Sequence, residues 1–282
     1  MPNSALNKAK RLRESIDKRG ASGLIVTIMR RLLSALAALL LFIAPAAAVI
    51  GNATTVRSAG VGRHIVMIVS TRGNLCTGTA LARDLVLTAG HCVQPAATYR
   101  VFLPGIAPPG LPLRAVVVHP RYNRKDYASG RVTADVALLK IDGALPADIV
   151  PAALATPPAV APGDRFTIAG YGSTVPDSET GQGTPRAAML VATGKPGTLQ
   201  IRLVDPLTRG ERAGLGACTG DSGAPAFIDN GGGSPAVIGV VSWSTGPANS
   251  EGCGGLTGVT PLTLHRAWID ETARKLGSPL PP

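Results

Sequence analysis

Charged and aromatic side chains are scarce in this sequence of 282 residues, at 16% and 4% of the total, whereas hydrophobic residues make up 45%. A chain with so few charges and so many apolar residues can bury a core, which excludes a globally disordered protein. Its length is typical of one large domain or two small ones.

A basic stripe interleaved with aromatic side chains, the pattern typical of nucleic-acid binding, is also missing. The formal net charge is +11, but residues 1–48 carry eight basic and two acidic residues, which leaves +5 for the rest. Because those remaining basic residues are scattered, we interpret them as an ordinary solvated surface and expect no nucleic-acid partner.

Cysteines are few, and none of the four forms a C-x-x-C pair, which argues against a zinc site. Cys76, Cys92, Cys218 and Cys253 all follow the N-terminal 48 residues. An even count in an exported chain predicts two disulfides, and the sequence alone permits three pairings. No cluster of metal ligands is visible, so we expect neither a metal nor a cofactor.

The N-terminal segment resembles an export signal. Arg30 and Arg31 precede an apolar run over residues 32–43, and the small residues Ala46 and Ala48 match a cleavage site before Val49. The alternative is an uncleaved anchor, although an apolar run of 17 residues to Ala48 that contains a proline is marginal for a span of roughly 20. We expect a leader over 1–48, translation starting at Met1 or Met29, and a secreted or periplasmic bacterial protein.

Short apolar runs between turns predict an all-β fold, a sandwich or a barrel, because the chain holds 34 glycines and 24 prolines and no helix separates the runs. The predicted strands lie at 64–70, 84–87, 114–118, 136–141, 165–169, 199–203 and 236–242. One helix is expected near residues 262–276, followed by a frayed tail. The proline-rich residues 144–163 are expected to connect two halves of the chain.

Three segments carry the residue types that acyl transfer by a serine requires. Residues 87–92 present His91, residues 134–139 place Asp135 at the head of an apolar strand, and residues 218–225 present Ser222 beside glycines. A serine hydroxyl needs a neighbouring base, and the base needs a carboxylate to orient it. Backbone N–H groups that stabilise the oxyanion contribute roughly 3–4 kcal/mol per donor.

These three segments resemble the histidine, aspartate and serine motifs of the chymotrypsin–trypsin family, in that family's order. The resemblance covers residues 49–276 and implies two six-stranded antiparallel β-barrels followed by a C-terminal helix. It implies a leader over 1–48 and a protease domain over 49–282, with the N-terminal barrel at about 49–150 and the C-terminal barrel and helix at about 151–276.

By resemblance, the chain is a serine endopeptidase in which His91 is the general base, Asp135 orients it and Ser222 attacks the carbonyl. The N–H groups of Gly220 and Ser222 would form the oxyanion hole. The family's disulfides would pair Cys76 with Cys92 and Cys218 with Cys253. Protein or peptide substrates are expected, with a possible protein inhibitor, and the chain is expected to be a monomer.

The resemblance also assigns the substrate-binding pocket. Gly216 occupies the floor position, where trypsin-like enzymes carry an aspartate for Arg or Lys, so we expect a neutral, apolar side chain before the cut bond. Glu251 is the one nearby acid that the sequence offers. The pocket residues so assigned are Gly216, Ala217, Thr219, Ser242, Trp243, Ser244 and Gly258, where Ser242–Ser244 would pair with the substrate backbone and Gly258 would keep one wall open.

Activation is expected to pair the ammonium of a new N-terminus at Val49 with Asp221. Residues 49–52 resemble the family's N-terminal motif, so signal cleavage and activation would coincide.

Two other hypotheses remain. An α/β-hydrolase would use Ser222, Asp229 and His265 in that order, but its G-x-S-x-G turn is incomplete because Ala224 replaces the last glycine. An inactive protease homologue that binds a partner is the alternative outside enzymes.

Overall fold

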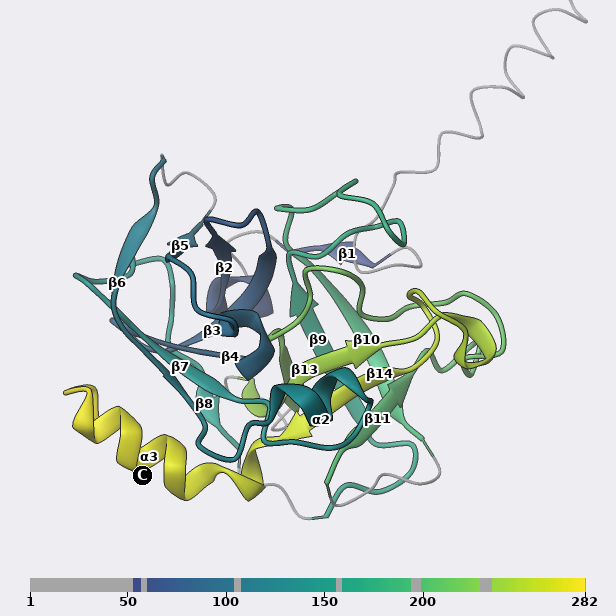
Figure 1. Ribbon diagram of the computed structural model, residues 1–282. Helices are drawn as coiled ribbons and strands as arrows, with labels where there is room; N and C mark the ends of the chain where they lie inside the picture. Colours follow the sequence, from purple (N-terminus) through teal and green to yellow (C-terminus); the bar gives the residue numbers. More distant parts are fainter. Residues whose placement is uncertain are drawn as a thin grey trace, which may run out of the picture. The chain divides into compact units, whose positions relative to one another are not determined.

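The computed structural model describes residues 53–56, 60–103, 108–155, 159–193, 199–228 and 235–281. Strands dominate this part of the chain, and its two α-helices are short (Figure 1). Among the described residues, no helix is long and apolar enough to cross a bilayer. The expected leader over 1–48, including its predicted cleavage site, lies outside the described residues.

Six antiparallel strands close into a first barrel in the order β2-β3-β4-β7-β6-β5, coloured blue to teal in Figure 1. Their bounds are β2 Ile65–Ser70, β3 Leu75–Ala82, β4 Leu85–Thr88, β5 Tyr99–Phe102, β6 Leu111–Val118 and β7 Ala137–Ile141.

A second ring of six antiparallel strands runs β10-β11-β14-β13-β12-β9 and closes through the pairing of β9 with β10. Two short strands add to this ring, β1 against β10 and β8 against β13. The bounds are β1 Thr54–Thr55, β8 Ala153–Leu154, β9 Arg165–Gly170, β10 Arg186–Ala192, β11 Ile201–Val204, β12 Pro225–Ile228, β13 Ala236–Ser244 and β14 Thr257–Pro261. The expectation of two six-stranded barrels is therefore confirmed.

The helices lie in connections and at the C-terminal end. They are the α-helices α2 Arg124–Ala128 and α3 Arg266–Lys275, and the 3-10 turns η1 Gly60–His64, η2 Gly90–Val93, η3 Pro247–Asn249 and η4 Leu262–Leu264. Asn123 caps α2 by accepting hydrogen bonds from the backbone N–H groups of Lys125 and Asp126. The predicted C-terminal helix is confirmed, as η4 followed by α3.

Strands β4 and β7 are apolar at nearly every position because both of their faces are buried. Side chains alternate across a strand, so neighbours in sequence face opposite sides. Val86 belongs to the interior of the first barrel, whereas Leu85 and Leu87 belong to a core cluster shared with Phe227 and Val240 of the second barrel. This shared cluster holds the two barrels together at about 25 cal/mol for each Å² of apolar surface buried.

The tail after α3 is packed rather than frayed, which corrects the expectation from the sequence. Ser278 is buried, and its hydroxyl donates to Asp84 at 2.6 Å. The ammonium of Lys140, from β7, lies 2.5 Å from Asp84 and 2.5 Å from the Ser278 hydroxyl. Leu280 packs against the shared core cluster. The prolines reduce the conformational entropy that this short tail loses on docking. The ion pair of Lys140 with Asp84 holds the tail in place through its hydrogen bonds to Ser278.

The Asp84 contacts predict a measurable loss of stability. Replacing Asp84 with alanine leaves the buried Lys140 ammonium without its carboxylate, and we expect the free energy of unfolding in urea to fall by about 3 kcal/mol. Glu271→Ala is the matched control, because its ion pair with Lys275 is exposed to solvent and should change the free energy of unfolding very little. Equal losses for the two variants would contradict the interpretation.

Candidate active site

His91 lies on the turn η2, directly after strand β4. The turn allows little space, since a Cβ atom on Gly90 would lie 3.1 Å from the ring of Tyr122 and 3.3 Å from Asp135. A disulfide between Cys76 and Cys92 ties this turn to β3. The second disulfide joins Cys218 to Cys253, so both expected pairings are present.

Asp135 is 1% exposed and accepts three hydrogen bonds. The backbone N–H of His91 donates to Oδ1 at 2.8 Å, and Nδ1 of the His91 ring lies 2.8 Å from Oδ2. The hydroxyl of Ser242, on β13, also donates to Oδ2 at 2.5 Å. These donors replace the water that a buried carboxylate loses. Because the carboxylate can only accept, it places the ring proton on Nδ1 and leaves Nε2 free to act as a base.

The ring of His91 stacks on Tyr127 of α2, with centroids 4.5 Å apart and an interplanar angle of 14°. The Tyr127 hydroxyl donates to the carbonyl of Ser242 at 3.0 Å. Burial, followed by the nearby charge of Asp135, raises the pKa of Tyr127, so its hydroxyl stays a neutral donor. Sequence analysis did not identify Tyr127, because an isolated tyrosine in a polar loop has no distinctive pattern.

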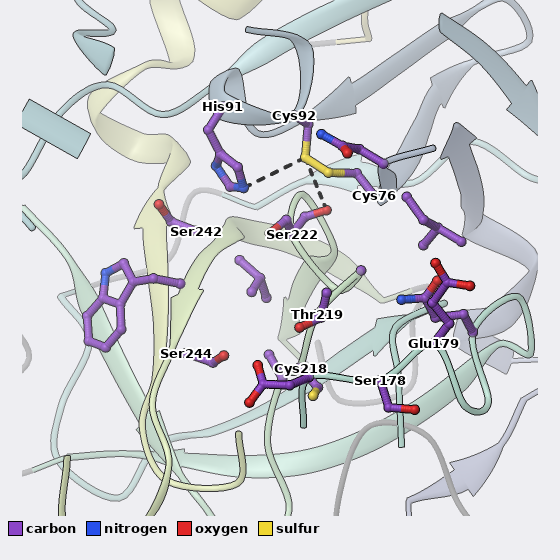
Figure 2. Close-up of a pocket in the computed structure, with 18 of the residues that line it drawn as sticks. Cys76, His91, Cys92, Ser178, Glu179, Cys218, Thr219, Ser222, Ser242 and Ser244 are labelled. Carbon is purple, nitrogen blue, oxygen red and sulfur yellow. Dashed lines mark hydrogen bonds between the residues drawn. A yellow bond between two sulfur atoms is a disulfide. The ribbon is translucent and has the colours of Figure 1, made fainter. Parts of the chain in front are cut away.

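Ser222 lies in the turn before strand β12, and its side chain lines the same cavity as His91 (Figure 2). Its carbonyl accepts a hydrogen bond from the backbone N–H of Thr77 at 2.8 Å, which fixes the turn to β3. Nε2 of His91 lies 3.9 Å from Sγ of Cys92, and that sulfur lies 3.5 Å from the Ser222 carbonyl oxygen. In the described part of the chain, no hydrogen bond joins Nε2 to the Ser222 hydroxyl.

The backbone N–H groups of Gly220 and Ser222 donate to no other described residue. Gly220 has a φ of +96°, and a Cβ atom there would lie 2.9 Å from Leu75 Cδ2. Its carbonyl accepts a hydrogen bond from the Thr77 hydroxyl at 2.9 Å, which holds the peptide in place. Two free donors on one tight turn are what an oxyanion requires.

Asp221 is fully buried beneath this turn. It accepts hydrogen bonds from the backbone N–H groups of Gly172 and Cys218, each at 2.9 Å. Burial raises the pKa of Asp221 to about 7, while those two bonds and the charge of Arg186 act in the opposite direction. Its expected partner, Val49, lies outside the described residues.

A cleft of about 610 Å³ is lined by most of the predicted site residues, together with acidic and amide side chains that the sequence analysis did not single out. Ala217, Thr219, Ser242, Trp243 and Ser244 line the cleft as expected. Asp177, Glu179, Gln182 and Asn74 also line it. Glu251 is exposed and absent from the lining, so the acids at this cleft come from the loop before β10.

The placement of Gly258 corrects the sequence-based expectation. Gly258 pairs with Trp243 across β13 and β14, and a Cβ atom on it would lie 2.0 Å from the Trp243 indole, which therefore covers it. Thr257 faces the predicted pocket floor instead, because its Oγ1 accepts a hydrogen bond from the Ala217 N–H at 3.0 Å and would lie 3.4 Å from a Cβ on Gly216. Neither Gly216 nor Gly258 lines the cleft.

Two other expectations concern metals and the α/β-hydrolase order. Cys76, His91 and Cys92 lie within 4.8 Å of one another, but both sulfurs are oxidised in a disulfide and offer no thiolate, so this group does not fit a metal. His265 packs against His119 and is not among the residues that line the cleft of Ser222. The all-β fold also excludes the α/β-hydrolase hypothesis, whose acidic residue, Asp229, lies outside the described part of the chain.

The glycine after Ser222 gives a prediction for this turn. Gly223 has a φ of +81°, and a Cβ atom on it would lie 2.1 Å from Thr88 Oγ1 and 2.3 Å from the Thr77 carbonyl. We expect Gly223→Ala to lower the free energy of unfolding by more than about 3 kcal/mol. Gly130→Ala is the control, because Gly130 also has a positive φ, +71°, but has no atom within 4 Å of its Cβ position. That variant should lose only about 1 kcal/mol, and similar losses in a urea titration would contradict the overlap.

Comparison with known proteins agrees with this geometry. The sequence model of the trypsin family matches residues 50–269. The chain belongs to the trypsin family. Among proteins of this family, it is 27% identical over 218 residues to the snake venom serine protease rhinocerase 4 of Bitis rhinoceros, which covers 73% of this chain and 81% of that one. It is 26% identical to human kallikrein-8, over 69% of this chain and 75% of that protein.

Solved trypsin-family folds superpose on most of the chain. The HL collagenase structure gives a TM-score of 0.63 at 23% identity and covers 79% of this chain and 98% of that one. Human heparin binding protein gives 0.62 at 22% identity and covers 83% and 99%. At these identities the likeness concerns the fold alone. The relatives named here come from a snake and a human, so they give no support to the bacterial source expected from the leader.

Proposed function

We propose that this trypsin-family chain is an exported serine endopeptidase in which His91, Asp135 and Ser222 act together on peptide bonds. The observation that carries the proposal is the buried Asp135, which accepts hydrogen bonds from the backbone N–H and from Nδ1 of His91. Nε2 is thereby left free in the cleft that Ser222 also lines. The proposed chain comprises a leader over 1–48 and a protease domain over 49–282, with the barrels at about 49–150 and 151–276.

In the proposed reaction, Nε2 of His91 takes the proton of the Ser222 hydroxyl as its oxygen attacks the substrate carbonyl. Asp135 stabilises the imidazolium that forms and keeps the ring oriented. The N–H groups of Gly220 and Ser222 receive the negative charge on the carbonyl oxygen. His91 then gives the proton to the leaving amine, which breaks the peptide bond and leaves an acyl group on Ser222 that water hydrolyses.

Specificity for a neutral, apolar side chain before the cut bond is part of the proposal. Gly216 and Ala217 bring no charge to the pocket floor, and the buried Thr257 takes up space beside both of them. A substrate guanidinium or ammonium there would lose its water without a carboxylate in return.

The proposed activation step pairs Val49 with Asp221. Asp221 is buried with two backbone donors and a raised pKa, so a cation beside it would be strongly favoured. Cleavage after Ala48 would supply that cation as a new N-terminal ammonium.

The alternative is an inactive homologue that binds a partner. The missing hydrogen bond between His91 and Ser222 is the one observation on its side. Catalytic hydrogen bonds are often long in proteases without substrate and shorten when substrate binds, so an active enzyme agrees with the same observation.

A fluorophosphonate probe tests the proposed chemistry. We expect the mature protein to gain the mass of one adduct, and the matched variant Ser222→Ala to gain none, because the probe needs an activated serine and a formed oxyanion hole. The starting mass reports the N-terminus. No adduct on a chain that begins at Val49 would favour the inactive homologue, and a mature chain that begins elsewhere would contradict the activation step.

Peptide substrates that differ only before the cut bond test the specificity. We expect kcat/KM for leucine to exceed that for arginine by at least about 100-fold. Thr257→Gly should raise kcat/KM for phenylalanine relative to valine by about tenfold, because it removes a side chain beside the pocket floor. Thr257→Ser keeps the hydroxyl that accepts from Ala217 and should change that ratio little. A preference for arginine in the unaltered enzyme would overturn the assignment.

A further inference from the structure

A second cavity, of about 420 Å³, lies beside the residues that precede Asp135 and shares no lining residue with the active-site cleft. It is formed by the segments on either side of α2 and by the end of η4 where it leads into α3. Leu199, two residues before β11, also lines it. Its lining residues are Arg121, Val132, Thr133, Ala134, Leu199, Leu264 and His265.

Apolar side chains are unusually exposed around this cavity. Val132 is 45% exposed, Leu199 58% and Leu264 44%. Single exposed apolar residues are ordinary, but three from distant segments around one hollow form a contiguous surface that a ligand can cover.

The polar side of the cavity contains an unsatisfied group. His265 is 6% exposed, and its Nδ1 has no hydrogen-bond partner. Leaving such a buried group unpaired is unfavourable, because the group has lost its hydrogen bonds to water and gained none in return. Burial, followed by the charges of His119 and Arg121, lowers the pKa of His265 to about 4, so the ring is neutral at physiological pH. A neutral imidazole can donate one hydrogen bond to an acceptor that enters the cavity.

The charge around the cavity is positive. Residues 121–131 carry Arg121, Arg124, Lys125 and Arg131 against one acid, Asp126, and Arg131 is the partner of that acid at 2.7 Å. Among the described residues, Arg121 has no ion pair, and it lines the cavity. A guanidinium of this kind suits a carboxylate.

We propose that this cavity binds the C-terminal end of a peptide, with an apolar terminal side chain on Val132, Leu199 and Leu264 and the free carboxylate on Arg121 and His265. A peptide C-terminus combines both features within a few ångströms, which matches the lining. If the proposed specificity holds, cleavage after an apolar residue generates this ligand, so the cavity would bind the enzyme's own products. That last step rests on the proposed function, whereas the binding itself does not.

Thr133 and Ala134 connect the cavity to the active site. They are the two residues before Asp135, and the Asp135 N–H donates to the Thr133 carbonyl at 2.9 Å. A ligand held against these residues contacts the backbone that positions the carboxylate beneath His91.

The test uses acetyl-Leu-Leu, with either a free carboxylate or a carboxamide, on full mature protein carrying Ser222→Ala. The chain has four histidines, so the ring signals in an NMR titration are few and can be assigned by substitution. We expect the acid to shift the His265 signals, with the amide at least about tenfold weaker. Arg121→Gln should weaken the acid about tenfold and leave the amide unchanged. Arg124→Gln, an exposed cation from the same segment outside the cavity lining, should change neither.

Each other outcome overturns the proposal. Shifts at His91 alone would mean that the peptide binds in the active-site cleft. Equal affinity for the acid and the amide would mean that Arg121 does not bind the carboxylate. No shift of His265 at about 5 mM peptide would mean that the cavity does not bind a C-terminus. Because the readout needs no turnover, a failed fluorophosphonate reaction would leave this result unaffected.

Discussion

The burial of a single carboxylate, that of Asp135, organises the candidate site. Its three donors come from both halves of the molecule, two from His91 beside the first barrel and one from Ser242 in the second. A charge with 1% exposure is tolerated only when such donors surround it. The geometry of His91 therefore depends on the barrels being docked, and the shared apolar cluster that docks them supports the site indirectly.

Thr77 on β3 fixes the turn that contains Gly220 and Ser222, just as Asp135 fixes His91. Its backbone N–H donates to the Ser222 carbonyl, and its hydroxyl donates to the Gly220 carbonyl and accepts from the Tyr171 N–H. One buried threonine of the first barrel thus fixes both ends of a turn that belongs to the second. Since carbonyls on this turn are held by Thr77, the N–H groups of Gly220 and Ser222 remain available for a substrate oxygen.

Sequence patterns predicted the parts of the fold where apolar residues are concentrated. Strands β2, β6, β7 and β13 follow runs of branched residues, and each was predicted. Strands β3 and β10 were not, because the first is rich in small residues and the second begins with Arg186, Ala187 and Ala188, which carry no strand preference. Pairing with neighbouring strands determines their structure, and that tertiary effect overrides local propensity.

Tertiary pairing also determines which site residues the sequence could predict. His91, Asp135 and Ser222 lie in short motifs with recognisable chemistry, so the sequence could single them out. Gly258 was expected to keep one wall of the pocket open, but Trp243 covers it and Thr257 lies beside Gly216 instead. The pairing of β13 with β14 shifts by one residue between Val241 and Trp243. A one-residue shift exchanges the two faces of a strand, and a bulge of this kind has no reliable sequence signal.

The raised pKa of Asp221 couples the turn around Ser222 to any cation that lies beside this carboxyl group. Its folded pKa, about 7, lies above that of an unfolded carboxyl, so the folded chain binds the extra proton. This contributes stability below about pH 4 that is lost as the pH rises through about 7, the opposite of an ordinary surface aspartate. A cation docked against Asp221 would lower the folded pKa and reverse that sign. At neutral pH, ionising the buried Asp221 therefore costs free energy, and a neighbouring cation removes that cost. The N–H of Asp221 donates to the Cys218 carbonyl, so a change at Asp221 acts directly on the peptides beside Gly220.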